Sequence, residues 1–517
     1  MSCHRASGAW VASGRPGGRA GVQRLNGLDG AFLAFESPTT HLHIAGVLVF
    51  DPTGVPGGVG FHQIRDLVAA RVSRVPPFRA RMVEVPFGLQ HPTMVDDPDF
   101  DVDFHVRRAS IPRPGGPDEL AALVGGIVGR PLDRRRPLWE FHVVEGLDHG
   151  HVALVSKVHH SIIDGVSGAE VMAAFFDLEA DPAGSTPGSG PHSATGYRAT
   201  EDGESEVWAP DPVPGDVDRL RDALGSLPRQ TDRLARTLGT TVRTVRNLSG
   251  RNRQIPGSLP PSLFEAPRTS INRAISSHRR VALAEMPLDD IRRVREVLGG
   301  TVNDVVLATV SGALRTFFSE RGEVLESSLV AMVPISVRSE KDRDALGNRV
   351  SALLVSLATG VEDPAARLRV ISSGMQVAKE QQQTVGSDVF SSWAQALFPM
   401  VATRVSRLVT NLRVFDHIPP LFNVIVSNIA GPDVPLFMAG ARMVAMYPFG
   451  PVTEGVGVNV TVFSYAGTMY VGVQGCWDLV PDVDVIANGM VDSLSDLVKE
   501  ANRRDRPVPW WHTDPHT

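Results

Sequence analysis

The sequence predicts a mixed α/β protein of two domains, and three observations support this fold class. The chain has 517 residues, which exceeds what one ordinary hydrophobic core accommodates. Strand-like apolar runs occur together with helix-like runs in both halves of the chain. Between the halves, residues 181–214 are rich in proline, glycine, serine and acidic side chains and have almost no periodic apolar pattern, which is typical of a flexible, exposed linker.

The first domain is predicted over residues 23–180. Residues 1–22 are rich in glycine, arginine and serine and lack the apolar stretch of a secretory signal, so we expect a disordered extension there. The periodicity of apolar residues predicts strands at 44–50 and 152–158 and helices at 61–74, 119–128 and 166–178.

The second domain is predicted over residues 266–502, between a linker with a basic helical segment at 181–265 and a tail at 503–517. Strand-like runs occur at 329–333, 352–357, 424–427, 457–462 and 469–473. Helices are predicted at 288–298, 303–321, 364–382 and 483–501.

The motif HHSIIDG at residues 159–165 joins a predicted strand to a predicted helix. Successive side chains of a strand point to opposite faces, so His159 and His160 cannot both face one cavity. One imidazole is therefore available as a base, and the other is expected to support the turn. Asp164 can hold an imidazole nitrogen or anchor the loop to a cation, and Gly165 permits a backbone conformation that a Cβ atom would resist. An imidazole that titrates near neutrality suits the removal of a proton from an alcohol.

Two other interpretations fit a histidine pair of this kind. A metal site is disfavoured because adjacent strand residues diverge and no HExxH motif or cysteine cluster accompanies them. Two structural histidines with satisfied hydrogen bonds would be the commoner case for such a pair taken alone. No G-x-S-x-G nucleophile elbow, Walker A motif or G-x-G-x-x-G motif in the right context occurs. Direct transfer between two bound substrates is therefore preferred over an acyl-enzyme.

Further segments follow in a fixed order along the chain. They are LDGAFL at 28–33, HLHI at 41–44, VDDPDF at 95–100, PLDRRRPLWE at 131–140, TVNDVVLA at 301–308, VPISVR at 333–338 with Gly347-Asn348, and SNIAGP at 427–432. With HHSIIDG, this set resembles the bacterial wax ester synthase/diacylglycerol acyltransferase family, in particular the actinobacterial triacylglycerol synthases, from about Leu25 to Val498. The sequence departs from the family pattern at Met94, at residues 429–430 and at residues 476–477. None of these positions touches the histidine and aspartate of HHSIIDG.

The resemblance implies a fold and an activity. The fold would be two related domains of the CoA-dependent acyltransferase superfamily, like chloramphenicol acetyltransferase, with the histidine motif in a channel between them. The activity would be acyl transfer from acyl-CoA to diacylglycerol, and in part to long-chain alcohols. By this resemblance His160 is the base that takes the proton from the acceptor hydroxyl, while Asp164 mainly fixes the loop.

The resemblance also points to further site residues. The tetrahedral intermediate needs hydrogen-bond donors for its oxyanion, and Asn303, Ser427 and Asn428 are candidates by their place in the motifs. An asparagine that opens a helix is, however, more often an N-cap, and Asp304 is expected to be structural. Trp139 is expected to shape the channel by packing. No cofactor and no metal are expected beyond acyl-CoA as co-substrate.

Composition bounds the partners and the location. The net charge of -6 and the lack of a basic recognition motif argue against nucleic acid. Two cysteines, Cys3 and Cys476, form no disulfide framework, which favours a reducing cytoplasm. No apolar run approaches the roughly 18 to 20 residues of a membrane-spanning helix. We therefore expect a cytoplasmic protein on the inner membrane face or on lipid bodies, with long-chain acyl-CoA and diacylglycerol or fatty alcohol as ligands.

Two segments are candidates for contact with a membrane or lipid-droplet surface. Residues 229–253 hold seven arginines against one acidic residue, with leucines and valines at helical spacing. This pattern fits a helix on an anionic lipid surface and, equally, a helix packed on its own domain with a solvated basic face. Residues 390–409 carry a second apolar pattern, for which a core helix is expected rather than a membrane contact.

Two alternative functions remain open from the sequence. One is an acyltransferase of the same superfamily that takes its acyl group from a carrier protein. The other is a catalytically silent lipid-binding protein that retains the fold. CoA release distinguishes the expected enzyme from both.

Overall fold

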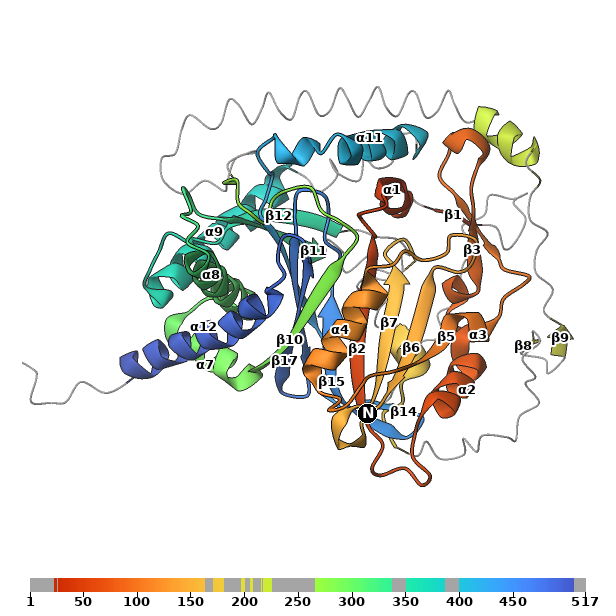
Figure 1. The fold of residues 1–517 in the computed structure, drawn as a ribbon, viewed down its shortest axis with the longest axis horizontal. Helices are drawn as coiled ribbons and strands as arrows, with labels where there is room; N and C mark the ends of the chain where they lie inside the picture. Colours follow the sequence, from red (N-terminus) through yellow and green to blue (C-terminus); the bar gives the residue numbers. More distant parts are fainter. Residues whose placement is uncertain are drawn as a thin grey trace, which may run out of the picture.

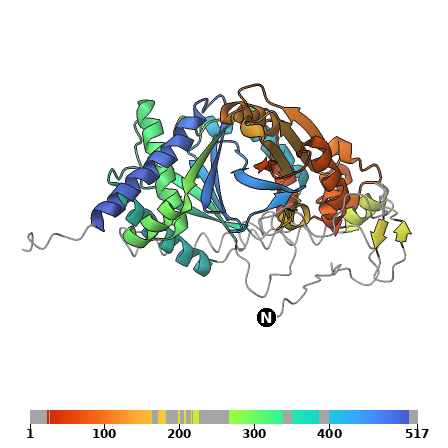
Figure 2. The same cartoon turned by 90° about the horizontal axis from the view of Figure 1, so that it is seen from below.

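The computed structural model describes residues 23–25, 27–162, 171–180, 197–199, 205–207, 215, 217–225, 266–336, 350–385 and 399–505. Within these ranges, two six-stranded mixed sheets stand side by side, each with helices packed on it (Figures 1 and 2). The predicted extension at 1–22, most of the predicted linker and the basic segment at 229–253 lie outside the described residues.

The first sheet has the strand order β14-β15-β2-β7-β6-β5. Its strands from the first half of the chain are β2 (His43–Asp51), β5 (Val106–Ser110), β6 (Trp139–Glu145) and β7 (Val152–His159). β5 runs parallel to β6, and β7 is antiparallel to both β2 and β6. Helix α2 (Phe61–Arg71) packs on β5 and β6, and α4 (Pro117–Val128) contacts β2 and the β10 strand of the second sheet.

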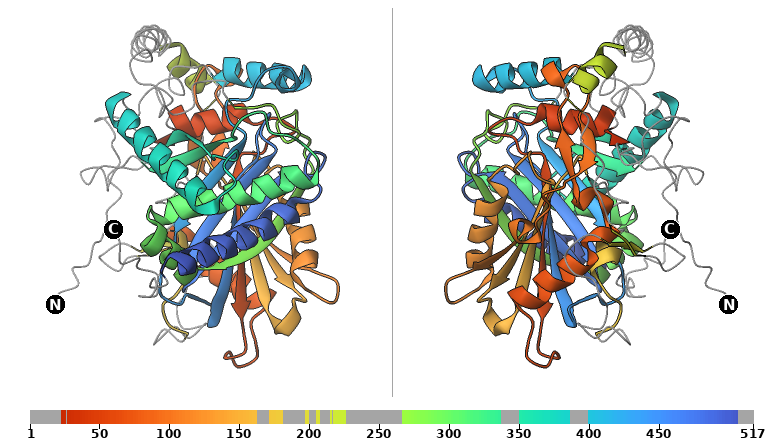
Figure 3. Two further views of the ribbon diagram at one scale, coloured as in Figure 1. Left: turned by 90° about the vertical axis from the view of Figure 1, so that its left-hand side faces the viewer. Right: turned by 90° about the vertical axis from the view of Figure 1, so that its right-hand side faces the viewer.

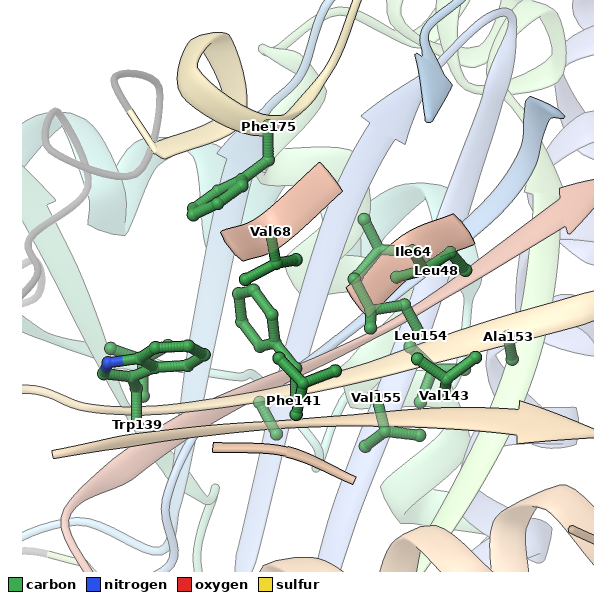
Figure 4. Packing of buried hydrophobic residues seen from close by; sticks show 14 of the residues in the cluster. Leu48, Ile64, Val68, Trp139, Phe141, Val143, Ala153, Leu154, Val155 and Phe175 are labelled. Carbon is green, nitrogen blue, oxygen red and sulfur yellow. The ribbon is translucent and has the colours of Figure 1, made fainter. Parts of the chain in front are cut away.

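The core of the first sheet is an aromatic and aliphatic layer on one face of β6 and β7. Trp139 and Phe141 point from β6 toward Phe175 and Val68, which come from residues 171–175 and from α2 (Figure 4). The indole of Trp139 is fully buried, and its Nε1–H donates to the Phe78 carbonyl at 2.8 Å. Alternate residues of β6 and β7 point away from this layer, so the other face of the sheet is free to carry polar groups.

The second sheet has the strand order β10-β17-β16-β13-β11-β12. Its strands are β10 (Arg279–Pro287), β11 (Val330–Ser336), β12 (Val350–Ser356), β13 (Val424–Ala430), β16 (Val458–Tyr465) and β17 (Thr468–Cys476). The helices α7 (Leu288–Leu298), α8 (Val302–Glu320), α9 (Pro364–Val385) and α12 (Val483–Arg504) cover it, as Figure 3 shows. Helix α8 is buried over most of its length and is the central helix of this layer, in contact with α7, α9 and α12.

One segment of the second half of the chain crosses into the first sheet. Strands β14 (Phe437–Met438) and β15 (Ala441–Phe449) complete that sheet, with β15 antiparallel to β2. A Cβ atom on Gly472 would lie 1.8 Å from the Pro448 carbonyl oxygen, so only glycine allows β17 to approach β15 this closely. The predicted boundary at residue 266 assigns this crossing segment to the second domain, whereas its strands lie in the first sheet.

Smaller elements surround the two sheets. A three-stranded sheet contains β1 (Gln23–Arg24), β4 (Thr93–Asp96) and β3 (Ala80–Val83), and β8 (Tyr197–Ala199) pairs with β9 (Ser205–Val207). Helices α1 (Gly27–Phe35), α3 (Val102–His105) and α11 (Pro399–Asn411) lie around the sheets, and residues 171–175 and 217–225 are also helical. The short turns are η1 (Val72–Arg74), η2 (Pro76–Phe78), η3 (Pro86–Gly88), η4 (Asp148–Gly150) and η6 (Val414–Asp416).

Most predicted elements match observed ones. The strands predicted at 44–50, 152–158, 329–333, 352–357, 424–427, 457–462 and 469–473 are confirmed as β2, β7, β11, β12, β13, β16 and β17. The helices predicted at 61–74, 119–128, 288–298, 303–321, 364–382 and 483–501 are confirmed as α2 with η1, α4, α7, α8, α9 and α12. The helix predicted at 166–178 is described only from residue 171, and it ends at residue 175.

The core helix predicted at 390–409 is wrong for its described part. That part belongs to α11, and Val405 and Leu408 are among the exposed large apolar residues of the protein. The physical reason is that α11 crosses the outside of the molecule over α1 instead of entering either sheet layer (Figure 1). Of the described helices, none is by itself long and apolar enough to cross a bilayer, and only α7 with α8, as a pair bent by 102°, meets that test.

Candidate active site

His159 is the last residue of β7, and its side chain is buried. It is 1% exposed, and its Nδ1 accepts a hydrogen bond from the backbone N–H of Ser161 at 3.1 Å. Because Nδ1 is an acceptor, the ring proton of the neutral imidazole belongs on Nε2, which lies 3.2 Å from Oε1 of Glu36. The His159 imidazole is therefore engaged on both sides and supports the turn that follows the strand.

The carboxylate of Glu36 contacts His159, Arg134 and Leu42 together. Its Oε2 accepts from Nε and Nη2 of Arg134 at 3.1 and 2.7 Å, and its Oε1 accepts from the backbone N–H of Leu42 at 3.2 Å. Burial raises the pKa of Glu36, but the hydrogen bond and charge of His159 and the charge of Arg134 outweigh it and hold this pKa well below its ordinary value. Glu36 is therefore a carboxylate at any physiological pH.

His160 sits differently from its neighbour. Its side chain is half-buried, and its backbone N–H donates to the Leu42 carbonyl at 2.9 Å. The imidazole stacks on the ring of Phe32, with centroids 4.3 Å apart and planes inclined by 22°. Leu42 thus links the two histidines, because its N–H binds the carboxylate that holds His159 while its carbonyl binds the backbone of His160.

A buried polar row continues from His159 along the same face of the sheet. Lys157 is 1% exposed, and its Nζ lies 3.7 Å from Oε2 of Glu140 on β6. Burial lowers the pKa of Lys157 to about 8. His43, opposite His159 on β2, is hydrogen-bonded through Nε2 to the Val128 carbonyl at 3.0 Å, and burial lowers its pKa well below the ordinary value. Burial, and then the charge of Arg279, lowers the pKa of His41, which stacks on His43, to about 4.

The boundary between the two domains passes beside this cluster. The guanidinium of Arg279, which begins β10, donates to the Thr39 carbonyl, and the Thr39 hydroxyl donates to the Glu454 carboxylate. A Cβ atom on Gly125 of α4 would lie 2.7 Å from the Arg279 carbonyl oxygen. The chain that leads into β2, and with it the histidine pair, therefore lies where the two domains touch.

The predicted residues of the second domain lie on α8 and β13. The helix cap is Thr301, whose hydroxyl accepts from the Asp304 N–H at 3.3 Å while Asp304 Oδ2 accepts from the Thr301 N–H at 2.8 Å. Asn303 is therefore not the cap but a half-buried residue in the first turn, and Asp304 is structural.

Ser427 and Asn428 are half-buried near the carboxyl end of β13, opposite Thr461 and Val462 of β16. A Cβ atom on Gly431 would lie 2.3 Å from the Ser464 carbonyl oxygen, which accounts for the glycine in SNIAGP. Helix α8 contacts β13, so Asn303 and this pair lie on adjacent elements of the second domain.

Three further predicted residues complete the comparison with the sequence. Asp164 and Gly165 lie outside the described residues. Trp139 stacks between Phe78 and His105, with centroids 4.9 and 4.5 Å away, and has no exposed surface. This burial places Trp139 in the core beneath β7, where it supports the site by packing instead of touching a ligand.

Sequence reasoning missed the residues that hold the histidines in place. Phe32 and Arg134 occur within LDGAFL and PLDRRRPLWE, but nothing in those segments connects them to the histidine pair. Glu36 stands between two motifs, and its only sequence signal is a charge that closes an apolar run. Among the described residues, no three His, Cys, Asp or Glu side chains are grouped as a metal site.

The arrangement can bring an imidazole to a hydroxyl group. His160 is the half-buried member of the pair, and its backbone is fixed from one side by Leu42 and its ring from another by Phe32. A base fixed in this way needs no rearrangement to meet a substrate proton, provided that the substrate enters beside it.

Comparison with known families gives matches along most of the chain. The wax ester synthase/diacylglycerol acyltransferase catalytic domain matches residues 25–306, and the C-terminal domain of the same family matches residues 346–498. A putative diacylglycerol O-acyltransferase of Mycobacterium tuberculosis is 34% identical over 96% of this chain and 94% of its own length. A probable diacylglycerol O-acyltransferase of the same species, tgs2, is 33% identical over 91% of this chain and 97% of its own length.

Solved structures confirm the expected two-domain fold. The wax ester synthase/diacylglycerol acyltransferase from Marinobacter aquaeolei VT8 superposes with a TM-score of 0.62 at 27% identity, covering 93% of this chain and 100% of that one. The first condensation domain of the CDA synthetase superposes with a TM-score of 0.51 at 18% identity, covering 93% of this chain and 97% of that one. The second likeness concerns the fold alone.

Proposed function

The chain belongs to the wax ester synthase/diacylglycerol acyltransferase family, and we propose that it transfers long-chain acyl groups from acyl-CoA to the free hydroxyl of diacylglycerol. The product is triacylglycerol, and long-chain alcohols are a second class of acceptor that gives wax esters. The observation that carries this proposal is the His160 imidazole, which is half-buried and held between Leu42 and Phe32 at the domain boundary.

In the proposed step, His160 removes the proton of the acceptor hydroxyl as that oxygen attacks the thioester carbonyl carbon. The tetrahedral intermediate collapses to the ester as its carbon–sulfur bond breaks. The imidazolium then returns its proton to the CoA thiolate, and CoA leaves as the thiol. Both substrates must be bound at once, because the hydroxyl oxygen attacks the thioester directly. No metal or cofactor takes part, since acyl-CoA supplies the activated acyl group.

The other site residues have supporting roles in this proposal. His159, Glu36 and Arg134 hold the strand end from which His160 projects. Asp164 and Gly165 are proposed to shape the loop that follows. Asn303, Ser427 and Asn428 are proposed as donors to the oxyanion, since they stand in segments that resemble the family motifs and are half-buried on α8 and β13.

The location follows from the acceptor. Diacylglycerol and long-chain alcohols reside in membranes and lipid droplets, so we propose a cytoplasmic enzyme that works on the inner membrane face or on lipid bodies.

The proposal is tested by CoA release from palmitoyl-CoA with the purified protein, offered diacylglycerol and hexadecanol in parallel, and with the lipid products resolved. We expect release with both acceptors, and more triacylglycerol than wax ester. Release with hexadecanol alone would correct the acceptor class.

The two alternative functions have their own outcomes in the same assay. Transfer from an acylated carrier protein, without transfer from palmitoyl-CoA, would establish a carrier-dependent donor. Binding of acyl-CoA and diacylglycerol without any release would establish a lipid-binding protein. Membership of the family does not favour either outcome.

A further inference from the structure

Helix α11 presents an apolar ridge to solvent. Val405, Leu408 and Leu412 follow one another at spacings of three and four residues, which places them on one face of the helix and its end. Their exposed fractions are 51%, 57% and 61%. Single exposed apolar residues are ordinary on protein surfaces, but three on one helical face form a contiguous apolar surface that a partner can cover.

The ridge extends onto the neighbouring elements. α11 packs against α1 and touches the η3 turn, and the Ser406 hydroxyl donates to the Phe35 carbonyl at 3.2 Å. Phe87 of η3 is 74% exposed, and Phe35 at the end of α1 is 39% exposed. We call these five residues, Phe35, Phe87, Val405, Leu408 and Leu412, the α11 surface.

The charge of α11 points to the partner. Arg404 and Arg407 are exposed, and each directly precedes a residue of the apolar ridge, so the two arginines line one flank of it. The helix contains no acidic residue, although the chain as a whole carries a net charge of -6. An apolar face flanked by arginines is complementary to an anionic lipid surface, where the apolar side chains enter the acyl boundary and the guanidinium groups bind phosphate.

The position of α11 connects this surface to the site. Both views in Figure 3 and the view in Figure 1 place α11 directly over α1, at the edge of the molecule. Phe32, one turn before Phe35 on α1, is the residue whose ring covers His160. A lipid surface against α11 would therefore be separated from the proposed base by α11 and α1.

We propose that the α11 surface docks the protein on anionic phospholipid membranes and so brings α1 and His160 next to the layer that contains the lipid acceptor. This inference rests on the proposed function, because the docking surface would deliver the acceptor of the proposed acyl transfer. It does not involve the basic segment at 229–253, which lies outside the described residues.

The test is flotation of the full-length protein with vesicles of phosphatidylcholine alone and of phosphatidylcholine with phosphatidylglycerol in equal parts. We expect binding to the anionic vesicles and at least about tenfold weaker binding by a variant carrying Leu408→Glu and Leu412→Glu, because these changes place charge where apolar side chains enter the membrane. The matched control carries Val324→Glu and Val370→Glu, which adds the same charge at exposed apolar positions elsewhere on the protein and is expected to bind like the wild type. A second variant, Arg404→Gln with Arg407→Gln, is expected to lose affinity for anionic vesicles and to bind neutral ones unchanged.

Equal loss in both glutamate variants, or no loss in either, would overturn the docking surface. The activity assay separates this failure from that of the proposed function. With hexadecanol dispersed in detergent micelles, the α11 variant is expected to keep wild-type turnover, whereas with diacylglycerol in anionic vesicles it is expected to slow at least about tenfold. Vesicle binding that depends on α11 without any acyl transfer would uphold the docking surface and reject the proposed function.

Discussion

The imidazole of His160 lies face to face with the ring of Phe32, at a centroid distance of 4.3 Å. Phe32 belongs to α1, which α11 covers from outside, while His160 follows the central strand β7 of the first sheet. The proposed base is thus held between the core of one domain and the outer helices.

Phe32→Ala removes one face of the His160 site. We expect turnover to fall about tenfold to a hundredfold, because the His160 imidazole is no longer held in its orientation. The KM for palmitoyl-CoA should change less, because the substitution leaves substrate binding in place. The free energy of unfolding should fall by about 1 to 3 kcal/mol, since the ring is half-buried. Steady-state kinetics and urea unfolding measure both effects. Phe32→Leu should recover most of the stability but less of the turnover, and unchanged turnover in the alanine variant would remove Phe32 from the account.

Glu36→Gln keeps the size and shape of the side chain but removes its negative charge. The carboxamide cannot accept from Arg134 and also from His159 and Leu42, so we expect a loss of about 1 to 3 kcal/mol in unfolding free energy. The matched control is Glu84→Gln, because Glu84 also faces Arg134, at 3.6 Å, but is mostly exposed. Its expected effect is below about 1 kcal/mol. Equal losses in the two variants would show that Glu36 contributes no more than a surface ion pair.

The contribution of Glu36 should depend on pH with a defined sign. Its pKa in the folded protein lies below the ordinary value of 4.5, so the unfolded state binds the proton more readily. The stabilisation is complete above pH 4.5 and is lost as the pH falls toward the folded pKa. Urea unfolding between pH 7 and about pH 3 should show a steeper acid decline for the wild type than for Glu36→Gln. Parallel curves for the two proteins would contradict the lowered pKa.

Lys157 should change the stability with pH in the same direction as Glu36, but in the alkaline range. Burial lowers its pKa from 10.5 to about 8, so between these values the unfolded state holds the extra proton and stability rises with pH. Lys157→Met should therefore be neutral or stabilising by up to about 3 kcal/mol near pH 7, because Glu140 retains Arg107 and His142 as partners. Its advantage over the wild type should shrink as the pH rises from 8 to 10. Chemical denaturation at pH 8 and pH 10 measures this difference in unfolding free energy. If the stability advantage of Lys157→Met grew with pH, the pKa of Lys157 would not be lowered by burial.

Gly472→Ala should separate the crossing strand β15 from the second sheet. The added methyl group would meet the Pro448 carbonyl, and we expect a loss of about 1 to 3 kcal/mol in unfolding free energy. Gly374→Ala is the matched control, because Gly374 lies in α9 with no atom within 4 Å of the added group. That change should stabilise by up to about 1 kcal/mol through helix propensity. Thermal unfolding compares the two variants. If Gly472→Ala were as stable as the wild type, β15 and β17 would be able to move apart and accommodate the added methyl group.

The sequence predicts the elements whose signal is local. Strands β2, β7, β16 and β17 and helices α7, α8 and α12 are long apolar patterns of the correct period, and they appear where the periodicity places them. The opposite environments of His159 and His160 also follow from strand geometry alone.

What the sequence does not predict depends on contacts between distant segments. The pairing of β15 with β2 joins the two halves of the chain, and the sequence of neither strand indicates its partner. Glu36 reaches His159 and Arg134 only after three segments have folded together. α11 carries an apolar pattern that suits a core helix equally well, because periodicity reports that a face is apolar but not what covers it.

The most direct test of the central claim is the rate of triacylglycerol formation from palmitoyl-CoA and diacylglycerol by His160→Ala, compared with His149→Ala. His149 lies in the exposed turn before β7, so its loss controls for removal of an imidazole from the same region. If His160 is the base, its alanine variant should lose at least about a hundredfold in turnover while its unfolding transition stays near that of the wild type, and His149→Ala should remain fully active. A folded His160→Ala protein with wild-type turnover would contradict the account.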